Sequence, residues 1–431
     1  MGRKKSSVRL HLFMNSKKVG HLDKPNHGGL RLKYDEEWLK NPNAIPLSLS
    51  LPLTKDTYSG DIVFSYFDNL LPDSDPVRKR LVEASGAASS DAFDLLQELG
   101  RDCVGALQLI AEDQKFDEGF SLDGDVLQMQ EVAKILKNLK VTPLGYDPDD
   151  DFRISIAGAQ PKTALLKLNG EWIRPKGTTP TSHILKPSIG KLANGIDLSN
   201  SVENEFICLK FCEFFGLPVA NAEIIHFDKE PCLVVERFDR IWSKDSRRLF
   251  RLPQEDFCQS LGVSGGRKYQ NQGGPSFVDG MKLLSTSDNP KEDQEIFLRA
   301  QLVFFLLGAT DGHAKNFSIF LNPTGFRMTP LYDVLSAEPA VKAGQIRWNK
   351  NKLAMSFGQN KHYQINSISF RHFEESCAMA SYSKQSFYEL ITDILIRSGE
   401  LESWTTSLGY DQESEVIYKG IQKRLKILAA G

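Results

Sequence analysis

The 431-residue sequence contains no apolar run that approaches the ~20 residues of a transmembrane helix. Its basic start, MGRKKS, is not followed by the apolar segment of a secretory signal. MGRKKS also fits the loose N-myristoylation pattern, but so short a pattern matches often by chance, and a basic chain end is the preferred interpretation. We therefore expect a soluble, cytoplasmic protein that does not bind membranes.

The sequence also has few cysteines and a formal charge close to zero. The formal net charge of −2 provides no overall attraction to nucleic acid or to a membrane surface. Most of the cysteines stand in apolar stretches such as FICLKFCEFF, which indicates small buried side chains in a reducing compartment and excludes a disulfide framework. No CxxC pair or histidine cluster completes a zinc site. The six cysteines are Cys103, Cys208, Cys212, Cys232, Cys258 and Cys377.

What the sequence does contain is the composition of a globular protein, with 41% hydrophobic and 25% charged residues. Strand and helix patterns alternate as far as a segment rich in proline, glycine and aspartate, VTPLGYDPDDD, which marks a boundary. Strand patterns then dominate, and helical spacing dominates towards the C-terminus. We therefore expect an α+β fold with an N-terminal α/β subdomain (1–145), a strand-rich lobe (146–252) and an all-helical lobe (253–431).

Small residues form a turn at residues 157–162, AGAQPK. The apolar segments RISI and TALLKL flank it and predict two strands. Small side chains let backbone N–H groups approach an anion closely, which is why phosphate-binding loops are rich in glycine. The turn has one glycine and no GK[ST] sequence opening a helix, so it is not a Walker loop, and an ordinary hairpin turn remains the alternative.

Two further stretches combine charge with buried strands. Lys186 stands in a short apolar strand, where a lysine either extends to water along its stem or meets an internal anion. Glu203 and Glu205, on the next helix, could pair with this lysine or favour the helix N-terminus through its dipole. The segment 236–238 follows the strand PCLVV, and its backbone and aromatic ring could hold a flat heterocycle. An edge strand ending in a charged turn is the alternative.

The stretch TDGHAKNF, residues 310–317, follows the apolar helix AQLVFFLLGA. Asp311 and Asn316 have the D-x4-N spacing of a protein-kinase catalytic loop, where the aspartate accepts the proton of the attacking hydroxyl and the asparagine helps to hold a metal ion. Asp333, in PLYDVL, stands where a second metal-binding carboxylate is expected. We expect His313 to bond the backbone rather than act as a base, and Lys315 to steady a phosphate or cap the helix. A polar turn after a buried helix explains this stretch alone, but the order of all these features favours a kinase.

Longer stretches make a resemblance recognisable. From about residue 8 to past residue 370 the chain resembles the HipA family, the serine/threonine kinase toxins of bacterial HipBA toxin–antitoxin modules. The remaining C-terminal residues resemble the family mainly in their helical pattern. The stretches that carry the resemblance are FDNLLPDS, ELGRDCVGALQL, DFRISIAGAQPKTALL, SVENEF, VVERFDR, RLPQEDFCQ, GATDGHAKNFSIF and LYDVLSA.

The resemblance implies a two-lobed, eukaryotic-protein-kinase-like fold with an additional N-terminal subdomain. It implies that Asp311 is the catalytic aspartate and that Asn316 and Asp333 bind Mg2+. It implies that Lys186 contacts the ATP phosphates. We take Glu205 as the candidate for a structural ion pair, although the sequence leaves open whether Glu203 or Glu205 pairs with Lys186. The implied ATP-binding residues are Ala157, Gly158, Ala159, Gln160, Pro161, Lys162, Lys186, Glu236, Arg237, Phe238, His313, Ala314, Lys315, Asn316, Tyr332 and Asp333.

The resemblance also implies regulation of the kinase. In the family, a serine before the phosphate-side loop autophosphorylates, which ejects the loop and inactivates the kinase, and the matching residue here is Ser155. A phosphate with a charge near −2 cannot remain packed in an apolar strand beside an ATP site. An ordinary small strand residue is the alternative for this serine.

Partners follow from the resemblance alone. They are a HipB-like helix–turn–helix antitoxin dimer that binds operator DNA and represses the operon, and an aminoacyl-tRNA synthetase substrate, glutamyl-tRNA synthetase, whose phosphorylation causes growth arrest and persistence. We expect the antitoxin to make most DNA contacts and the basic clusters RRLFR and KGIQKRLK to be solvated faces. Substrate recognition is expected in surface loops such as SGGRKYQNQGGPS, residues 264–276. A small-molecule phosphotransferase of the aminoglycoside-kinase type and a non-catalytic corepressor are the alternatives.

Overall fold

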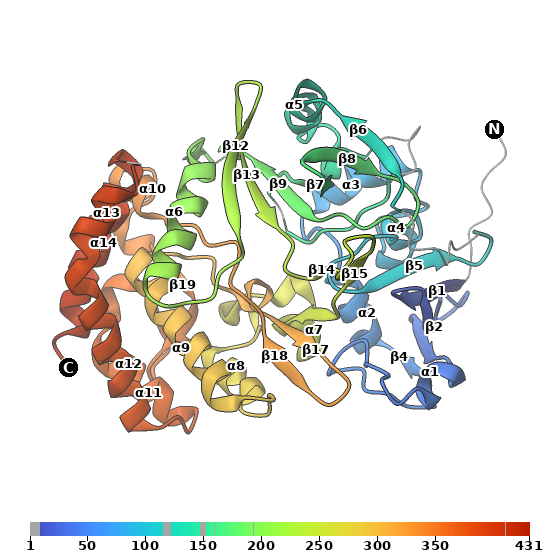
Figure 1. The fold of residues 1–431 in the computed structure, drawn as a ribbon. Coiled ribbons are helices and arrows are strands. Elements are labelled where there is room, and N and C mark those ends of the chain that lie inside the picture. The colour runs from blue at the N-terminus through green and yellow to red at the C-terminus, as the bar shows by residue number, and fades with distance from the viewer. Residues whose placement is uncertain (1–8, 115–121, 147–151, 159, 193, 410) are drawn as a thin grey trace. The chain divides into compact units, whose positions relative to one another are not determined.

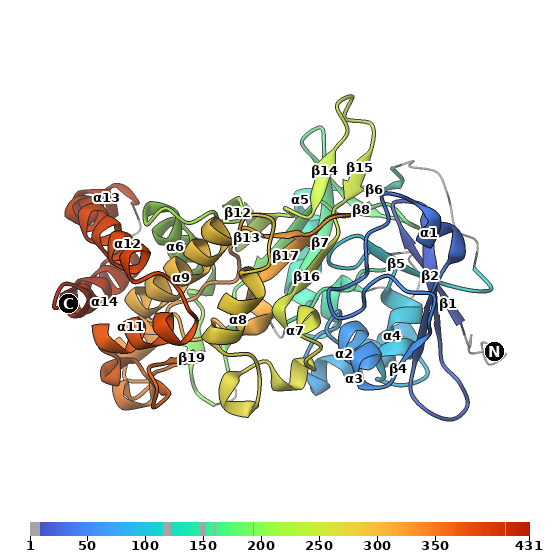
Figure 2. The same ribbon diagram turned by 90° about the horizontal axis from the view of Figure 1, so that it is seen from below.

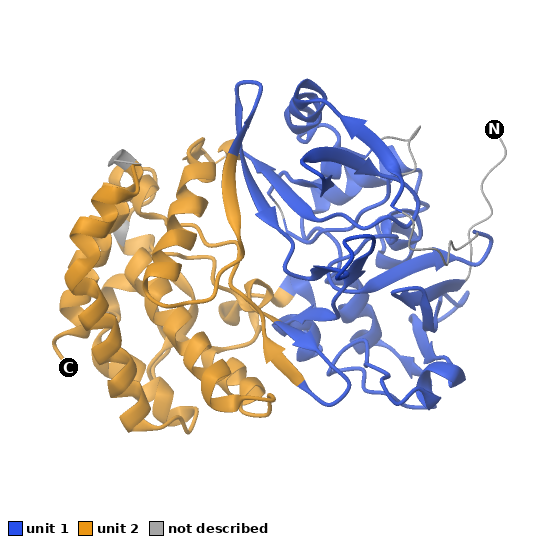
Figure 3. Cartoon of the chain, viewed as in Figure 1, with its two compact units in different colours: residues 1–187, 225–266, 319–325 blue, residues 188–224, 267–318, 326–431 orange. Residues whose placement is uncertain are grey.

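The computed structural model describes residues 9–114, 122–146, 152–158, 160–192, 194–409 and 411–431 (Figures 1 and 2). The chain divides into two compact units, each built from separated segments (Figure 3). Unit 1 contains residues 1–187, 225–266 and 319–325, and unit 2 contains residues 188–224, 267–318 and 326–431. The chain therefore crosses from one unit to the other several times.

The first sheet of unit 1 has the strand order β4-β3-β2-β1-β5. Strand β1 alternates buried and half-buried residues, the period of two expected of a sheet that covers a core with one face. Helices α2, α3 and α4 lie against this sheet (Figure 2). The elements are β1 (Arg9–Met14), β2 (Lys17–Asp23), β3 (Arg31–Tyr34), α1 (Glu36–Lys40), β4 (Tyr58–Ser59), α2 (Asp61–Asp68), α3 (Asp75–Ser85), α4 (Ala92–Leu99) and β5 (Leu107–Ala111).

The second sheet of unit 1 has the order β12-β13-β9-β7-β8-β6, and β12 begins in unit 2. The central strand β7 pairs with β8 on one side and β9 on the other, antiparallel in both cases. The elements of this sheet and its helix are β6 (Gly124–Leu127), α5 (Met129–Asn138), β7 (Thr163–Leu168), β8 (Glu171–Pro175), β9 (His183–Pro187), β12 (Ala222–Phe227) and β13 (Glu230–Glu236). The elements outside it are β14 (Arg240–Trp242) and β15 (Leu249–Arg251), which pair with each other, β16 (Gln254–Asp256), α7 (Phe257–Ser260) and β17 (Ser318–Leu321), which pairs with β16.

One hydrophobic core joins the N-terminal sheet and helices to later residues of unit 1. Leu10 and Phe67 belong to it together with Tyr146, Phe152 and Ile156. The core is therefore continuous across the predicted boundary between residues 145 and 146. The division into 1–145, 146–252 and 253–431 stays a prediction.

Unit 2 is mainly helical. Helix α9 is buried over most of its length, as expected of a helix that is apolar on several faces. Arg424 of α14 fixes α14 to it by donating to the Leu306 carbonyl at 2.9 Å. The elements are β10 (Gly190–Lys191), β11 (Asp197–Leu198), α6 (Ser201–Phe214), α8 (Phe277–Leu284), α9 (Pro290–Leu307), β18 (Phe326–Met328), α10 (Glu338–Lys342), β19 (Lys352–Phe357), β20 (His362–Gln364), α11 (Phe370–Met379), α12 (Lys384–Arg397), α13 (Leu401–Ser407) and α14 (Asp411–Leu428).

The structure confirms the α+β class and the burial of six unpaired cysteines. Residues 253–431 are not all helical, because short apolar runs such as KLAMSF form strands rather than helices. The hairpin predicted around AGAQPK is wrong. Strands β8 and β9 pair with the two edges of β7, so the RISI segment does not pair with it. Ile154 of this segment instead forms an isolated parallel β-bridge with Asp102. Among the described residues, no helix combines the length and hydrophobicity needed to cross a membrane.

Candidate active site

The turn that carries Asp311 begins where α9 ends. Gly308 ends the helix in the left-handed conformation, with φ of 65°. Ser336 links the end of α9 to α6, because its hydroxyl donates to the Leu307 carbonyl at 2.6 Å and its carbonyl accepts from the Asn204 side chain at 2.9 Å. The end of α9 is thus fixed to α6, and the turn that follows starts from a defined position.

Residues 311–316 form a tight, internally bonded turn. The Asp311 carbonyl accepts the His313 N–H at 2.8 Å and the Asn316 side-chain amide at 2.7 Å. Gly312 packs so closely that an added Cβ would lie 2.5 Å from the Phe304 ring. The D-x4-N spacing therefore corresponds to one compact turn in which the asparagine supports the backbone of the aspartate.

The Asp311 carboxylate points outward while its neighbours are buried. Its side chain is 56% exposed, whereas that of His313 is 4% exposed. His313 Nε2 lies 3.7 Å from Asp311 Oδ1, and Tyr269 donates its hydroxyl to the same oxygen. The Tyr269 ring contacts the imidazole edge to face, with 4.8 Å between ring centroids. His313 therefore lies beneath the carboxylate as a packed neighbour.

Asp333 is connected to the same turn through Tyr332. The Tyr332 hydroxyl donates to the Lys315 carbonyl at 3.0 Å and lies 2.5 Å from the Ser318 hydroxyl. Asp333 itself has φ of 60°, a conformation that costs a non-glycine residue on the order of 1 kcal/mol or more and recurs at functional sites. Unit 2 thus brings together the predicted residues 311–316, 332 and 333.

The donor set of this turn suits Mg2+. The Asn316 amide nitrogen is held by the Asp311 carbonyl, so its amide oxygen is the group that can face a cation. Mg2+ commonly binds one or two protein oxygen ligands and takes the rest from phosphates and water. One carboxylate, Asp333, and one amide oxygen meet that requirement. Within the described residues no group of three or more His, Cys, Asp or Glu side chains is gathered as a metal cluster.

Ser155 is completely buried in unit 1. Its hydroxyl donates to the Leu70 carbonyl at 2.8 Å, and its N–H donates to the Asp102 carbonyl at 3.0 Å. The serine is therefore held by two bonds between the N-terminal helices and the start of the loop 157–162.

The loop 157–162 closes on its own lysine. Lys162 donates to the Ala157 carbonyl at 2.9 Å, and Gly158 has φ of 99°, with Lys162 Nζ 2.7 Å from where a Cβ would lie. A side chain at position 158 would be strained and would collide with this lysine. Ala159 lies outside the described residues.

The loop leads directly into β7, which pairs with β9, the strand that carries Lys186. Thr163, the first residue of β7, pairs with Leu185, the neighbour of Lys186. Lys186 is 5% exposed and pairs with Leu233 of β13. Unit 1 thus brings the predicted loop and the predicted lysine together. Glu205 is completely buried in α6 of unit 2, and its pairing with Lys186 stays a prediction.

Residues 236–238 leave β13 in three different environments. Glu236 is exposed, and the half-buried Phe238 contacts Phe320 edge to face at 5.7 Å. The N–H of Arg237 donates to the Ser182 carbonyl at 2.9 Å, and its guanidinium is buried among acidic groups. The Arg237 side chain therefore belongs to the interior, and only the backbone of this segment stays a candidate for contact with a heterocycle.

Sequence reasoning missed the buried ion cluster to which Arg237 belongs. Asp102 Oδ1 contacts Arg240 at 2.9 Å and Arg251 at 2.8 Å, while its Oδ2 contacts Arg237 at 3.2 Å. Asp239 completes the cluster at 2.8 Å from Arg237. The alternation of charge in ERFDR after a buried strand is a weak signal of such a cluster, but no spacing reveals that residues 102 and 251 meet.

Opposite charges in the cluster stabilise the ionised form of Asp102. Burial by itself would raise the pKa of Asp102, but attraction by the three arginines outweighs it and holds that pKa far below its usual range. Burial and the nearby Arg237 lower the pKa of Arg240 to about 10. Asp102 and Arg240 therefore stay charged near neutral pH, and the cluster is an ionic contact between the N-terminal subdomain and the residues that follow the second sheet.

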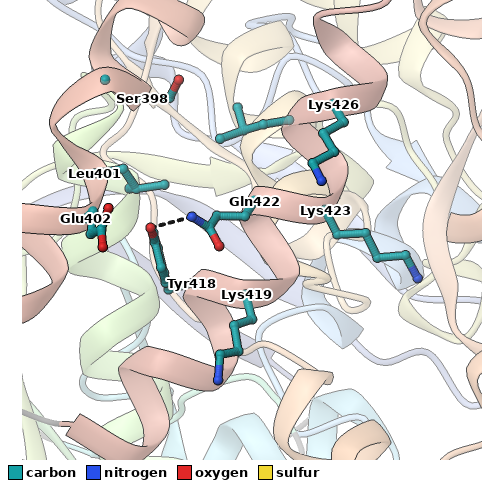
Figure 4. Close-up of a pocket in the computed structure, with 10 residues that line it drawn as sticks. Ser398, Leu401, Glu402, Tyr418, Lys419, Gln422, Lys423 and Lys426 are labelled. Atoms are coloured by element: carbon teal, nitrogen blue, oxygen red, sulfur yellow. Dashed lines mark hydrogen bonds between the residues drawn. The ribbon is translucent and has the colours of Figure 1, made fainter.

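A separate hollow of about 490 Å³ lies along α14 in unit 2 and contains none of the predicted site residues (Figure 4). Lys419, Lys423 and Lys426 project from this helix, and Lys419 pairs with Glu415 at 2.6 Å. The fourth basic residue of KGIQKRLK, Arg424, is instead buried and bonded to Glu338 at 2.6 Å. The lysines of this cluster are exposed, as expected of a solvated face, and its arginine is structural.

Two protein-family models match consecutive segments of the chain. Residues 10–110 match the model of the HipA N-terminal domain, and residues 154–399 match that of the HipA-like C-terminal domain. A putative kinase of Sinorhizobium fredii, Y4mE, is 37% identical over 333 residues, which are 76% of this chain and 77% of that protein. The serine/threonine-protein kinase toxin HipA of Shewanella oneidensis is 29% identical over 71% of this chain and 69% of that protein.

A solved structure has the same fold. It is the Shewanella oneidensis complex of HipA, HipB and operator DNA, in which a chain 24% identical to this one superposes with a TM-score of 0.79. The superposition covers 98% of this chain and 97% of that chain. Both HipA domain models are matched in order, and the putative kinase Y4mE, at 37% identity, matches three quarters of the sequence. The chain therefore belongs to the HipA family of kinases.

Proposed function

We propose that this protein is an ATP- and Mg2+-dependent serine/threonine protein kinase in which Asp311 is the catalytic base. The observation that carries the proposal is the exposed Asp311 carboxylate on a turn braced by Asn316 and joined through Tyr332 to the strained Asp333. In phosphoryl transfer, a carboxylate in this role accepts the proton of the attacking hydroxyl. The hydroxyl oxygen then bonds to the γ-phosphorus as the bond to the β-γ bridging oxygen breaks, which yields ADP.

The other proposed site residues would bind Mg2+ and ATP. Bound Mg2+ would neutralise charge on the nucleotide phosphates, with Asn316 and Asp333 as its protein ligands. Lys186 and the loop 157–162 would bind the phosphates, since both lie at the same end of β7 and β9. The backbone of residues 236–238 would receive the adenine.

Replacement of Asp311 by Asn tests this proposal. General-base catalysis contributes on the order of 10²-fold or more, so Asp311→Asn should reduce phosphate transfer from ATP to casein by at least about that factor. ATP affinity, measured with a fluorescent analogue, should change little. The exposed Asp56→Asn is the matched control and should keep wild-type activity. Wild-type transfer by Asp311→Asn would refute the assignment.

We also propose that Ser155 is an autophosphorylation site that switches the kinase off. Its complete burial supports this switch, because a phosphate cannot stay between the Leu70 carbonyl and the apolar core. Phosphorylation would therefore displace residues 155–162. Incubation with ATP followed by intact-mass analysis should show one added phosphate that is lost in Ser155→Ala. Proteolysis around residues 152–162 should become faster with phosphate incorporation, and unchanged labelling of Ser155→Ala would contradict the site.

The partners and the substrate are proposed at the level of the family. The Shewanella oneidensis relative was solved with HipB and operator DNA, which supports a HipB-like antitoxin as the partner of this chain. We propose an aminoacyl-tRNA synthetase, glutamyl-tRNA synthetase in the first instance, as the substrate whose phosphorylation arrests growth. Expression without antitoxin should inhibit growth for the wild type and not for Asp311→Asn. A mutant that remains equally inhibitory would favour the non-catalytic corepressor instead.

A further inference from the structure

A tyrosine donates a hydrogen bond to the carboxylate of Asp311. Tyr269 lies in the segment 264–276, the loop expected to recognise substrate, and donates its hydroxyl to Asp311 Oδ1. Its ring is held edge to face on His313, with 4.8 Å between the centroids. All three residues belong to unit 2. The carboxylate is thus hydrogen-bonded by a hydroxyl group supplied by the protein itself.

The turn that presents Tyr269 is closed and anchored. The Tyr269 carbonyl accepts the N–H groups of Gln272 at 2.9 Å and Gly274 at 3.0 Å. Gly274 crosses the start of the turn so tightly that a Cβ would lie 2.0 Å from the Arg267 carbonyl oxygen. The segment is therefore a compact turn that carries the tyrosine as a unit.

A two-way contact holds this turn on β19. Gln270 donates its side-chain amide to the Ser356 hydroxyl at 2.8 Å, and its amide oxygen accepts the Ser356 N–H at 2.8 Å. Because the tyrosine sits next to this anchor, its hydroxyl is held at Asp311 by the backbone of the turn as well as by its own bond. Movement of the tyrosine away from the carboxylate requires a change of its rotamer or release of this anchor.

The bond resembles the one that a substrate must make. A seryl or threonyl hydroxyl donates to the catalytic carboxylate before its proton is transferred. We propose that Tyr269 is a gate on the acceptor position, whose phenol hydroxyl holds the place of the substrate hydroxyl and must be displaced when a protein substrate binds. This inference rests on the proposed kinase function and adds regulation of substrate entry at the same site.

Removal of the single hydroxyl tests the gate. Tyr269→Phe keeps the ring contact with His313 and deletes only the competing donor. A hydrogen bond to a charged group is strong enough that its loss should raise kcat/KM for casein about tenfold, mainly through a lower KM for the protein acceptor. ATP affinity should stay unchanged, and ATP hydrolysis without acceptor should rise, because water can then reach the carboxylate.

Tyr388→Phe is the matched control, because Tyr388 also donates to a carboxylate of unit 2, Glu374 Oε1, at 3.0 Å. It should behave like the wild type. An unchanged kcat/KM in Tyr269→Phe, or a lower kcat with the same KM, would overturn the gate, the latter in favour of a tyrosine that positions the aspartate. Absence of transfer in the wild type and both variants, with ATP still bound, would instead refute the kinase proposal itself.

Discussion

Glu255 is a buried carboxyl group outside the proposed catalytic residues. It is completely buried in β16, and its Oε1 accepts the Leu49 N–H at 2.9 Å. Burial raises the pKa of Glu255 from 4.5 to about 8, with the Leu49 N–H opposing the shift. At neutral pH the folded protein therefore holds this group largely in its protonated form, whereas the unfolded chain releases the proton.

We therefore predict that the contribution of Glu255 to the free energy of unfolding falls as the pH rises. The contribution of Glu255 is fully present below pH 4.5 and is lost progressively up to about pH 8, at up to about 1.4 kcal/mol of unfolding free energy per pH unit. Glu255→Gln mimics the neutral form and should flatten this slope in urea denaturation between about pH 5 and about pH 8. The exposed Glu171→Gln should leave it unchanged. Identical slopes for the Glu255 variant and the wild type would contradict the prediction.

At the scale of elements, buried charged side chains join several pieces of unit 1 in addition to its apolar core. Asp102 binds arginines from the end of β13 and from the hairpin β14–β15. Asn15, in the turn between β1 and β2, exchanges two bonds with the Arg251 backbone at 2.8 and 2.9 Å. The backbone of Asp102 also supports Ser155. One aspartate thus connects the N-terminal subdomain, the second sheet and the segment proposed to carry the regulatory serine.

Loss of the Asp102 charge should be severe. Asp102→Asn removes an acidic partner from three buried arginines, of which Arg237 and Arg240 keep their contacts with Asp239. Breaking a buried ion pair costs about 3–5 kcal/mol. We expect a loss of that size in urea unfolding. Asp23→Asn removes the partly exposed pair with Arg9, at 2.7 Å, and should cost about 1 kcal/mol or less. Equal losses of unfolding free energy in the two variants would show that the buried cluster contributes no more to stability than a partly exposed ion pair.

At the scale of the whole molecule, the two units interleave along the chain. The core that begins with Leu10 in β1 includes Phe152, Ile154 and Ala164, which follow the predicted first boundary. The N-terminal subdomain therefore shares its core with the segment that carries Ser155. A chain cut at that boundary would expose apolar surface on both products.

A fragment of residues 146–431 tests this shared core. Because Phe152 and Ile156 lose their partners from residues 10–111, we expect the fragment to be largely insoluble or to lack a cooperative thermal transition. Full-length protein made in parallel is the control, and circular dichroism with limited proteolysis is the measurement. A soluble fragment that melts as cooperatively as the full chain would show that 1–145 is an independent domain.

The sequence by itself determined the α+β class, the resemblance to the HipA family and the turn at Asp311 and Asn316. These depend on local spacing and periodicity, and a tight turn places residues five apart in contact whatever surrounds it. In the structure, Gly308 and Gly86 end α9 and α3 in the left-handed conformation, which glycine adopts more readily than other residues.

Only the tertiary structure decided how distant residues combine. It pairs the segment of Ser155 with Asp102 instead of β7, gathers charges 149 positions apart around that aspartate, and brings Tyr269 onto Asp311. Nothing in local sequence encodes these contacts, because they arise when strand edges are filled and buried charges find partners in the assembled core. For Ser155 and for the charges around Asp102, the physical reason is that a buried polar group must be satisfied, and which group satisfies it depends on the whole fold. The exposed Asp311 meets Tyr269 for a different reason, because the fold brings a turn that lies 42 positions away in the sequence next to it.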